Sequence, residues 1–393
     1  MKTKIITRKV LYPLIALSVI LSSSCGKAPA NQSSVNLQQS IYAPLDEASL
    51  NKNLNNNTDE VMTAASVVKA EDLLKKDQEA KDDEKVITQS LFPKAPDYSG
   101  PVTLPSGVKK FDLQMKSEPE EIKKIFEPSA LCFDENGNMF TIADKLFFSI
   151  YSLKKTSKGY HADDAVKMKT MQILKYRLKK KNRFDFEGLE YFNNLFYVSD
   201  ERDRKVFTVD RQGNLNDLKI DINGYLKANG IRNNEENSGF EGLTIDPKNN
   251  LLFLTKERQE EAVLVVDLKT NKVIRHFKVN LPGNVEPALT DASFFDGNLY
   301  VLVRSHRQVL KLNPENGEVL SIYDYRHHEE NPNYVYRKIP VFGSGNDPQG
   351  YGVMEGLAVT KDKIFVATDN NMLPLKKNIF NNHPQLFTFE RPE

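Results

Sequence analysis

The sequence predicts an all-β protein, a β-propeller of five blades with six as the alternative, preceded by a signal peptide and a disordered or partly helical tether. Three observations lead to this prediction. A motif recurs at intervals of 50 to 64 residues after residue 108, strand-like runs surround each copy, and the composition before residue 108 is of low complexity. Radial repetition of short antiparallel strands is the pattern of a propeller.

The first 24 residues have the organisation of a signal peptide. Four cations within the first nine residues precede an apolar stretch at 10–21 and then small residues up to Cys25. Twelve apolar residues are too few for a membrane span, which needs about 20. Cys25 resembles the acylated first residue of a bacterial lipoprotein, although Ser22 stands where that motif usually has Leu. We therefore expect a lipid anchor on Cys25 that holds the protein on the bacterial envelope, in the outer membrane or facing the periplasm. Secretion without acylation is the alternative.

Residues 25–107 are predicted to form a tether. The segment 51–57 contains five Asn, and such a composition cannot bury enough apolar surface for a packed core. The segment 59–85 has helix formers but few apolar positions, which allows at most one marginal amphipathic helix. That helix is interpreted as a solvated stalk, with a docking helix as the alternative, and the propeller domain is expected at 108–393.

The charge balance argues against a nucleic-acid partner. The chain has 54 basic and 53 acidic residues, and removing residues 1–24 leaves 50 and 53, a net charge of −3. A nucleic-acid binding protein would be expected to carry a clear basic excess. The second cysteine, Cys132, lies in an apolar run and is expected to be a buried free thiol. We expect a monomer.

Each repeat after residue 108 is predicted to begin with a β-hairpin. Two runs rich in Leu, Phe, Val and Tyr flank an Asn, Asp or Gly turn in each copy, as hairpins require. The copies are SALCFDENGNMFTIAD from Ser129, FEGLEYFNNLFYVSDER from Phe186, FEGLTIDPKNNLLFLTKER from Phe240, TDASFFDGNLYVLVRSH from Thr290 and MEGLAVTKDKIFVATDN from Met354. The ring is predicted to close by pairing of 109–114 in the blade that contains 385–389.

The residues that open these repeats are predicted to face the central channel, because the first strand of a blade lies nearest the axis. They are Ser129, Glu187, Glu241, Asp291 and Glu355. Carboxylates gathered in a channel lose hydration and repel one another unless protons or a cation compensate. Since no His or Cys is among them, the predicted ion is Ca²⁺, held by Glu187, Glu241, Asp291 and Glu355. The alternative is that these side chains bind backbone N–H groups of neighbouring blades and latch the blades together.

The ends of the second strands supply further charges, which are predicted to surround the channel mouth. They lie at Asp144, 200–202, 256–258, 304–307 and Asp369. Arg202, Lys256, Arg258 and Arg304 are predicted to hold an anionic substrate, with Asp200 or His306 as the proton acceptor. The alternative is that these charges form salt bridges among themselves at the rim.

The spaced FEGLE, FEGLT and MEGLA units, the YVSDER and FLTKER strand ends and the closing ATDNN and QLFTFERP resemble the esterase-like phytase domain family. They also resemble the related SdiA-regulated propeller proteins. The resemblance covers about residues 108–392. It implies a secreted or envelope β-propeller that binds calcium and hydrolyses phosphate or other esters. Glu187, Glu241 and Glu355 match the repeated Glu of the family, whereas Asp291 and Ser129 depart from it.

Several functions therefore remain open. The first is a Ca²⁺-dependent hydrolase acting on a small anionic ester, and the alternative is a non-catalytic, calcium-stabilised propeller that binds an envelope protein or glycan. Lactone hydrolysis is a third possibility, and it resembles what gluconolactonase-type propellers do with one central Glu-bound cation. The chain has no Gly-x-Ser-x-Gly motif, which disfavours serine catalysis. The HHEE run at 327–330 is interpreted as a solvated polar loop.

Overall fold

The structure is a computed structural model that describes residues 106–393 except 126, 144–147, 171, 174–183, 234–238, 259, 280, 282–286, 335, 337–352, 371–372, 376 and 379. The chain divides into the units Met1–Phe92 and Pro93–Glu393, and all described residues belong to the second unit. The predicted signal, Cys25 and the predicted stalk helix lie outside the described residues, as does Asp144. No helix in the described part is long and apolar enough to cross a membrane.

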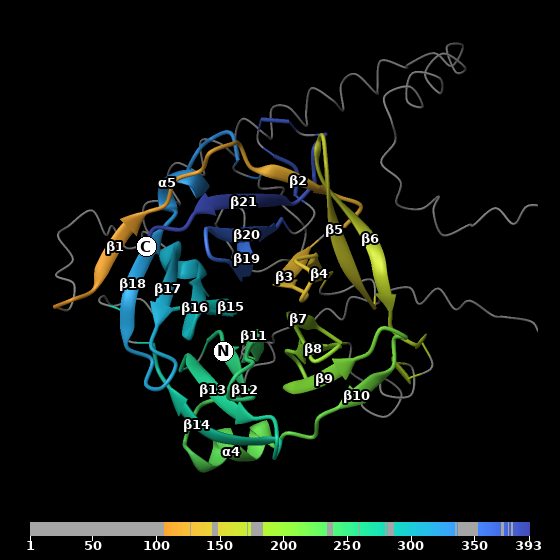
Figure 1. Ribbon diagram of the computed structural model, residues 1–393, viewed down its shortest axis with the longest axis vertical. Helices are drawn as coiled ribbons and strands as arrows, with labels where there is room; N and C mark the ends of the chain where they lie inside the picture. Colours follow the sequence, from red (N-terminus) through yellow and green to blue (C-terminus); the bar gives the residue numbers. More distant parts are fainter. Residues whose placement is uncertain are drawn as a thin grey trace, which may run out of the picture. The chain divides into compact units, whose positions relative to one another are not determined.

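The strands form largely antiparallel sheets arranged around a central axis, and the fold is a β-propeller (Figure 1). One sheet has β3 (Pro128–Phe133), β4 (Met139–Ala143), β5 (Ser149–Thr156) and β6 (Gly159–Lys167). The next has β7 (Phe186–Phe192), β8 (Leu195–Asp200), β9 (Lys205–Val209) and β10 (Leu215–Asp217). A third has β11 (Phe240–Asp246), β12 (Leu251–Lys256), β13 (Ala262–Asp267) and β14 (Lys272–Phe277).

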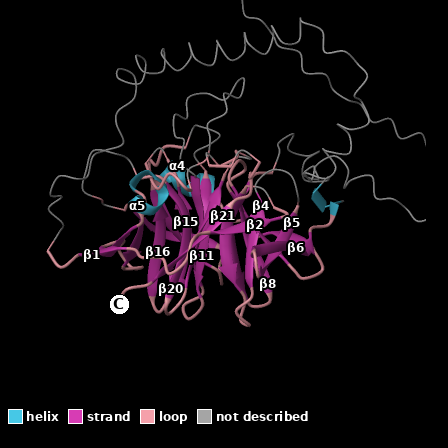
Figure 2. Cartoon of the chain, turned by 90° about the horizontal axis from the view of Figure 1, so that it is seen from above, coloured by secondary structure: helices cyan, strands magenta, loops and turns pink. Residues whose placement is uncertain are grey.

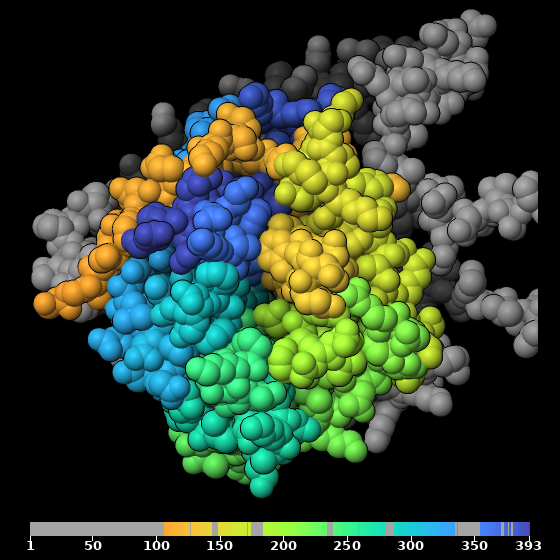
Figure 3. All heavy atoms as spheres, viewed as in Figure 1, coloured from red at the N-terminus to blue at the C-terminus, as the bar shows by residue number. Residues whose placement is uncertain are grey.

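The remaining strands complete the circle. They are β15 (Leu289–Phe295), β16 (Asn298–Val303), β17 (Gln308–Leu312) and β18 (Val319–Asp324), followed by β19 (Val353–Val359), β20 (Lys363–Asp369) and β21 (Gln385–Glu390). Short helices lie between strands at α4 (Ile222–Ala228), η2 (Arg304–His306) and α5 (Arg326–Glu329). Figure 2 shows α4 and α5 on the same side of the sheets, and Figure 3 shows the segments following one another around the ring.

The first strands of the sheets line the axis. Strands β3, β7, β11, β15 and β19 contact one another in this order, and β19 contacts β3, so the described inner strands close a ring. This is the arrangement that the five-bladed prediction requires. The number of blades stays a prediction, because the segment 337–352, where a sixth blade would need strands, lies outside the described residues.

The ring is closed by the N-terminal part of the domain, in a different register from the predicted one. Strand β2 (Glu120–Lys123) pairs antiparallel with β21 and parallel with β6, and so joins two sheets into one of eight strands. Strand β1 (Lys109–Asp112), which we predicted to accompany β21, pairs instead with β18 of the preceding sheet. Only the end of the predicted segment reaches β21: the backbone N–H of Glu390 donates to the carbonyl of Gln114 at 3.0 Å, and Met115 forms an isolated bridge with Phe389.

The core lies between neighbouring sheets. Phe140 of β4 packs edge-on against Phe196 of β8 at 5.1 Å between ring centroids, and aliphatic residues fill the next interface, including Leu243 and Leu264. Cys132 is a buried free thiol, as predicted. Stacking of apolar sheet faces in this way leaves the polar residues to the axis and the ends of the strands.

A β-bulge interrupts each first strand near its start. The register shifts fall at Ser129, Glu187–Gly188, Glu241, Thr290 and Glu355. Thr290, and not Asp291, therefore occupies the position of the repeated Glu. Asp291 pairs with Leu302 as Gly242 pairs with Thr255, so the predicted alignment was displaced by one residue in this repeat. A bulge redirects the side chain that it inserts.

Asp291 links first strands across the ring. Its buried carboxylate accepts hydrogen bonds from the backbone N–H groups of Leu357 in β19 (2.7 Å), Ala292 (2.8 Å) and Leu131 in β3 (3.4 Å). Burial raises the pKa of Asp291, and these three N–H donors act in the opposite direction. These are the contacts that the latch alternative predicts, and they correct the prediction that Asp291 is a metal ligand.

We expect the substitution Asp291→Asn to lower the free energy of unfolding by about 1–3 kcal/mol, because an amide NH₂ would face a buried backbone N–H that needs an acceptor. Urea unfolding of the purified protein measures this change. The matched control is Asp296→Asn in an exposed turn, which should change stability by less than about 0.5 kcal/mol. Equal effects of the two substitutions would contradict the latch.

Candidate metal centre

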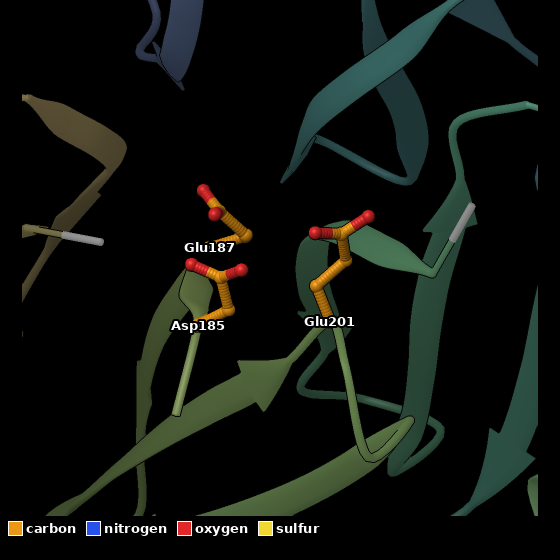
Figure 4. A group of neighbouring side chains, drawn as sticks. All are labelled: Asp185, Glu187 and Glu201. Carbon is orange, nitrogen blue, oxygen red and sulfur yellow. The ribbon is translucent and has the colours of Figure 1, made fainter. Parts of the chain in front are cut away.

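Three buried carboxylates lie together where β7 begins and β8 ends. Asp185 immediately precedes β7, Glu187 lies at the bulge of β7, and Glu201 immediately follows β8. One oxygen of each lies within 4.8 Å of those of the other two, and the residues are only 3%, 7% and 4% exposed. Figure 4 shows the three carboxylates grouped at these strand ends. We call this set the acidic triad.

The hairpin geometry explains why these three residues meet. The backbone N–H of Glu201 donates to the carbonyl of Asp185 at 2.9 Å, which extends the β7–β8 ladder by one pair. Glu187 lies two residues after Asp185 in the sequence, and the bulge turns its side chain toward the axis. Gly188 is required here, because a Cβ at this position would lie 2.6 Å from Ser199 Oγ and 2.9 Å from the backbone nitrogen of Leu243.

Glu201 also contacts the next sheet. The backbone N–H of Gly239 donates to Glu201 Oε1 at 3.2 Å, and a Cβ on Gly239 would lie 2.2 Å from the carbonyl oxygen of Glu201. Glu241, at the bulge of β11, lies close enough for the carboxylate of Glu201 to raise its pKa. The triad is thereby joined to the acid of the adjacent repeat.

A second acidic group surrounds Arg304. Its Nη1 donates to Glu355 Oε1 at 2.5 Å, and its Nη2 donates to Glu257 Oε1. Glu257 follows β12 and is 2% exposed. The Nε of Arg258 contacts the other oxygen of Glu257 at 2.7 Å. Glu257 is therefore held by two guanidinium groups.

Burial and mutual repulsion leave these acids short of compensating charge. Burial raises the pKa of Glu201, and the carboxylates of Asp185 and Glu257 raise it further. Burial also raises the pKa of Glu241 well above its usual range, with contributions from Glu257, Glu201 and Glu355, while Arg304 lowers it. A cation bound among these oxygens would offset this cost.

The acidic triad fits a hard divalent cation. Asp185 Oδ1 is buried and has no hydrogen-bond partner among the described residues, whereas Oδ2 contacts the Nε of Arg202. All the available donors are carboxylate oxygens, the type preferred by Ca²⁺ and Mg²⁺. The buried triad can therefore hold a metal ion.

A family model described as Phytase-like, "Esterase-like activity of phytase", matches residues 126–372. The chain belongs to the phytase-like family. A search of curated proteins finds no match.

Similar solved structures include Myxococcus xanthus glutaminyl cyclase, at 13% identity and a TM-score of 0.44, with 72% of this chain and 100% of that chain covered. Another is hydrazine synthase of Kuenenia stuttgartiensis, at 13% identity and a TM-score of 0.35, with 64% and 59% covered. These likenesses are too distant to carry any statement about chemistry. The resemblance to SdiA-regulated proteins stays a prediction.

The phytase-like domain brings some of the predicted metal ligands together and separates others. Glu187 belongs to the acidic triad, Glu241 interacts electrostatically with Glu201 of the triad, and Glu355 lies in the group around Arg304. Asp291 lies outside both groups, for the reason given above. The predicted single acidic ring is therefore two groups that meet at Glu241.

The predicted substrate-binding cations are engaged with these acids. Arg202 pairs with Asp185, while Arg258 and Arg304 pair with Glu257. Lys256 is buried, and its ammonium donates to the carbonyl of Arg258. These contacts agree with the alternative that the charges form salt bridges at the rim, although the side chain of Arg258 stays 53% exposed.

The two predicted proton acceptors differ in basicity. Burial and the carboxylates of Asp203 and Asp185 raise the pKa of Asp200 to about 7, and Asp200 also accepts the backbone N–H of Asp185 at 3.3 Å. Burial lowers the pKa of His306 to about 4, and its Nδ1 lies 2.9 Å from Ser305 Oγ. Asp200 is therefore the stronger base and the one adjacent to the acidic triad.

Sequence reasoning missed Asp185, Glu201 and Glu257 as site residues. Glu201 and Glu257 could have been found in the sequence. They are the middle residues of the triplets DER (200–202) and KER (256–258), and the aligned repeats place both directly after the second strand. We had chosen the residues that flank them. The HHEE run, interpreted above as a solvated polar loop, is instead helical in its first three residues, which lie in α5, and its buried Glu329 pairs with Arg307 at 3.2 Å.

We expect the substitution Glu201→Gln to weaken Ca²⁺ binding at least about tenfold, or about 1.4 kcal/mol, because it removes a charged ligand. Without metal, the parent should lose stability as the pH rises above the ordinary Glu pKa of about 4.3, because burial raises the pKa of Glu201 and the folded state must give up this proton. The Glu201→Gln variant should lose less stability than the parent over the same rise in pH, because its amide has no proton to give up.

Calorimetric titration with Ca²⁺ and thermal unfolding in chelator at several pH values measure the two effects. The matched control is Glu190→Gln, a carboxyl of β7 that bonds Thr244 at 2.7 Å instead of joining the triad. A loss of affinity of equal size in both variants would show that the triad is not the metal site.

Proposed function

We propose that the domain is a Ca²⁺-dependent hydrolase of phosphate or other esters, with its metal centre at Asp185, Glu187 and Glu201. The observation that carries this proposal is the buried all-oxygen triad, in a chain of the phytase-like family, with an Asp185 oxygen that has no hydrogen-bond partner in the described part of the chain. Calcium is the favoured ion because it accepts six to eight oxygen ligands with tolerant geometry. The triad would leave coordination positions for water and for an ester oxygen.

A bound cation would supply Lewis acidity toward the ester oxygen and lower the pKa of a water molecule. The chain's own residues would provide the remaining functions. Asp200, with a pKa of about 7, would accept the proton of the attacking water. Arg304, fixed by Glu257 and Glu355, would stabilise negative charge on the substrate without having to reorganise. The partly exposed Arg202 and Arg258 would draw an anionic ester toward the site.

A second function is favoured by the salt bridges. Because Arg202, Arg258 and Arg304 already pair with acids, the charged end of the channel neutralises itself in part. Such a surface suits a non-catalytic propeller in which Ca²⁺ provides rigidity and an envelope protein or glycan is bound. Propellers support many unrelated functions, so the fold does not decide between the two.

Activity on a panel of phosphoesters, aryl esters and lactones, with Ca²⁺ and with chelator, distinguishes these functions. The hydrolase should turn over at least one ester class in Ca²⁺ and lose that activity in chelator. Asp200→Asn should lower kcat/KM by about 10²–10⁴-fold, the usual contribution of a general base, while Glu190→Gln should leave it unchanged. No turnover on the panel, with chelator lowering only the melting temperature, would reject the enzyme and support the binding propeller.

We also propose that the mature protein is a monomer held at the bacterial envelope by a lipid on Cys25, with the segment up to residue 107 as its tether. This proposal comes from the signal-like residues 1–24 and the cysteine that follows them. A tethered domain of this kind would meet small anionic esters or envelope components outside the cytoplasm.

The substitution Cys25→Ser should move the protein from the detergent phase to the aqueous phase in a Triton X-114 separation of expressing cells, because the acyl chains would be lost. The matched control is Cys132→Ser, at the other cysteine of the chain, which should stay in the detergent phase. Aqueous partition of the unaltered protein would show that Cys25 is not acylated.

A further inference from the structure

Arg304 stands at a position that carries an acid in two other sheets. It follows β16 directly, as Glu201 follows β8 and Glu257 follows β12. The backbone repeats as well. Arg304 N–H donates to the carbonyl of Ala288 at 3.0 Å, just as Glu201 N–H donates to Asp185 and Glu257 N–H to Gly239. The ring thus replaces a carboxylate by a guanidinium at one equivalent place.

The guanidinium of Arg304 lies among carboxylates of the same origin as the acidic triad. The triad combines a bulge residue, Glu187, with a residue that follows a second strand, Glu201. The group around Arg304 combines the bulge residue Glu355 with Glu257, which also follows a second strand. Carboxylates from the same kinds of strand position thus form the proposed metal site in the acidic triad and surround a guanidinium in the group around Arg304.

Burial makes this arrangement depend on the positive charge. The side chain of Arg304 is 20% exposed, and those of Glu257 and Glu355 are 2% and 12% exposed. The carboxyl of Glu241 interacts with both groups, since the carboxylates of Glu257 and Glu201 raise its pKa and Arg304 lowers it. Removing one partner of a buried ion pair leaves an uncompensated charge that some other cation must offset.

We propose that Arg304 takes the place of a second divalent cation, so that this end of the channel binds one metal ion, at the acidic triad, beside a permanently charged guanidinium. This inference rests on the proposed metal centre. Unlike a bound metal ion, an arginine side chain cannot dissociate into the solvent or be removed by a chelator, and it remains positively charged at all accessible pH values. A single cation next to a fixed guanidinium suits the paired oxygens of one anionic group, as in an ester of phosphoric acid.

The experiment counts Ca²⁺ bound to the full mature protein, by calorimetric titration and by elemental analysis after equilibrium dialysis. The unaltered protein should bind one Ca²⁺, and Arg304→Gln should bind two, because Glu355 and Glu257, which then keeps only its contact with Arg258, join Glu241 as ligands. Arg304→Lys keeps the charge and should bind one. In chelator, Arg304→Gln should have a lower melting temperature than the unaltered protein. Addition of Ca²⁺ should raise the melting temperature of Arg304→Gln by more than it raises that of the unaltered protein.

The matched control is Arg307→Gln, which removes an arginine three residues away that pairs with Glu329 and Glu330. It should destabilise the fold without adding a bound ion. One ion in both the unaltered protein and Arg304→Gln would overturn the inference and leave the proposed metal centre standing. No ion in the unaltered protein and one in Arg304→Gln would reject the metal centre but support the substitution of a metal by Arg304. No ion in either protein would overturn both.

Discussion

The close approach of the first strands around the axis is the constraint on which the rest of the structure depends. Gly188 and Gly242 each have a neighbouring backbone within 3 Å of where a Cβ would lie. This approach leaves little room for water, so every polar group on the inner strands must find a partner inside the ring. Where backbone N–H groups are available, as beside Asp291, a carboxylate holds strands together. Where the acids gather, as in the acidic triad, a cation would offset their mutual repulsion.

The position of a carboxylate relative to the bulge decides whether it joins an acidic group or holds neighbouring strands together. The acids inserted at the bulges, Glu187, Glu241 and Glu355, belong to the two acidic groups or interact with them. After the bulge the residues return to the ladder, at Gly242 in β11 and at Gly356 in β19. Asp291 occupies the second kind of position. One residue of displacement along a strand thus separates an acid that can bind a ligand from one that ties strands together.

Much of the fold could be predicted from the sequence, because the recurring Glu-Gly-Leu units and alternating apolar runs record the hairpins directly. The domain and Glu187 as an acid of the site followed from this pattern. The pairing of β2 with both β21 and β6 did not, since four residues with a single buried side chain give no strong signal. The alignment at Thr290 and Asp291 failed because a bulge changes the register without changing the composition. Asp185 was missed because it precedes the repeated unit, and only the extended β7–β8 ladder brings it opposite Glu201.

Strand β2 gives the domain a mechanical property as well as a closed ring. Two residues of β2 pair with the last strand, β21, and the next two pair with β6, while β1 upstream lies parallel to β18. Tension applied along the chain ahead of residue 106 must therefore reach the domain through the same strands that fasten its circumference. Release of β1 and β2 would open the ring at its seam, whereas a pull on any hairpin turn would load a single sheet.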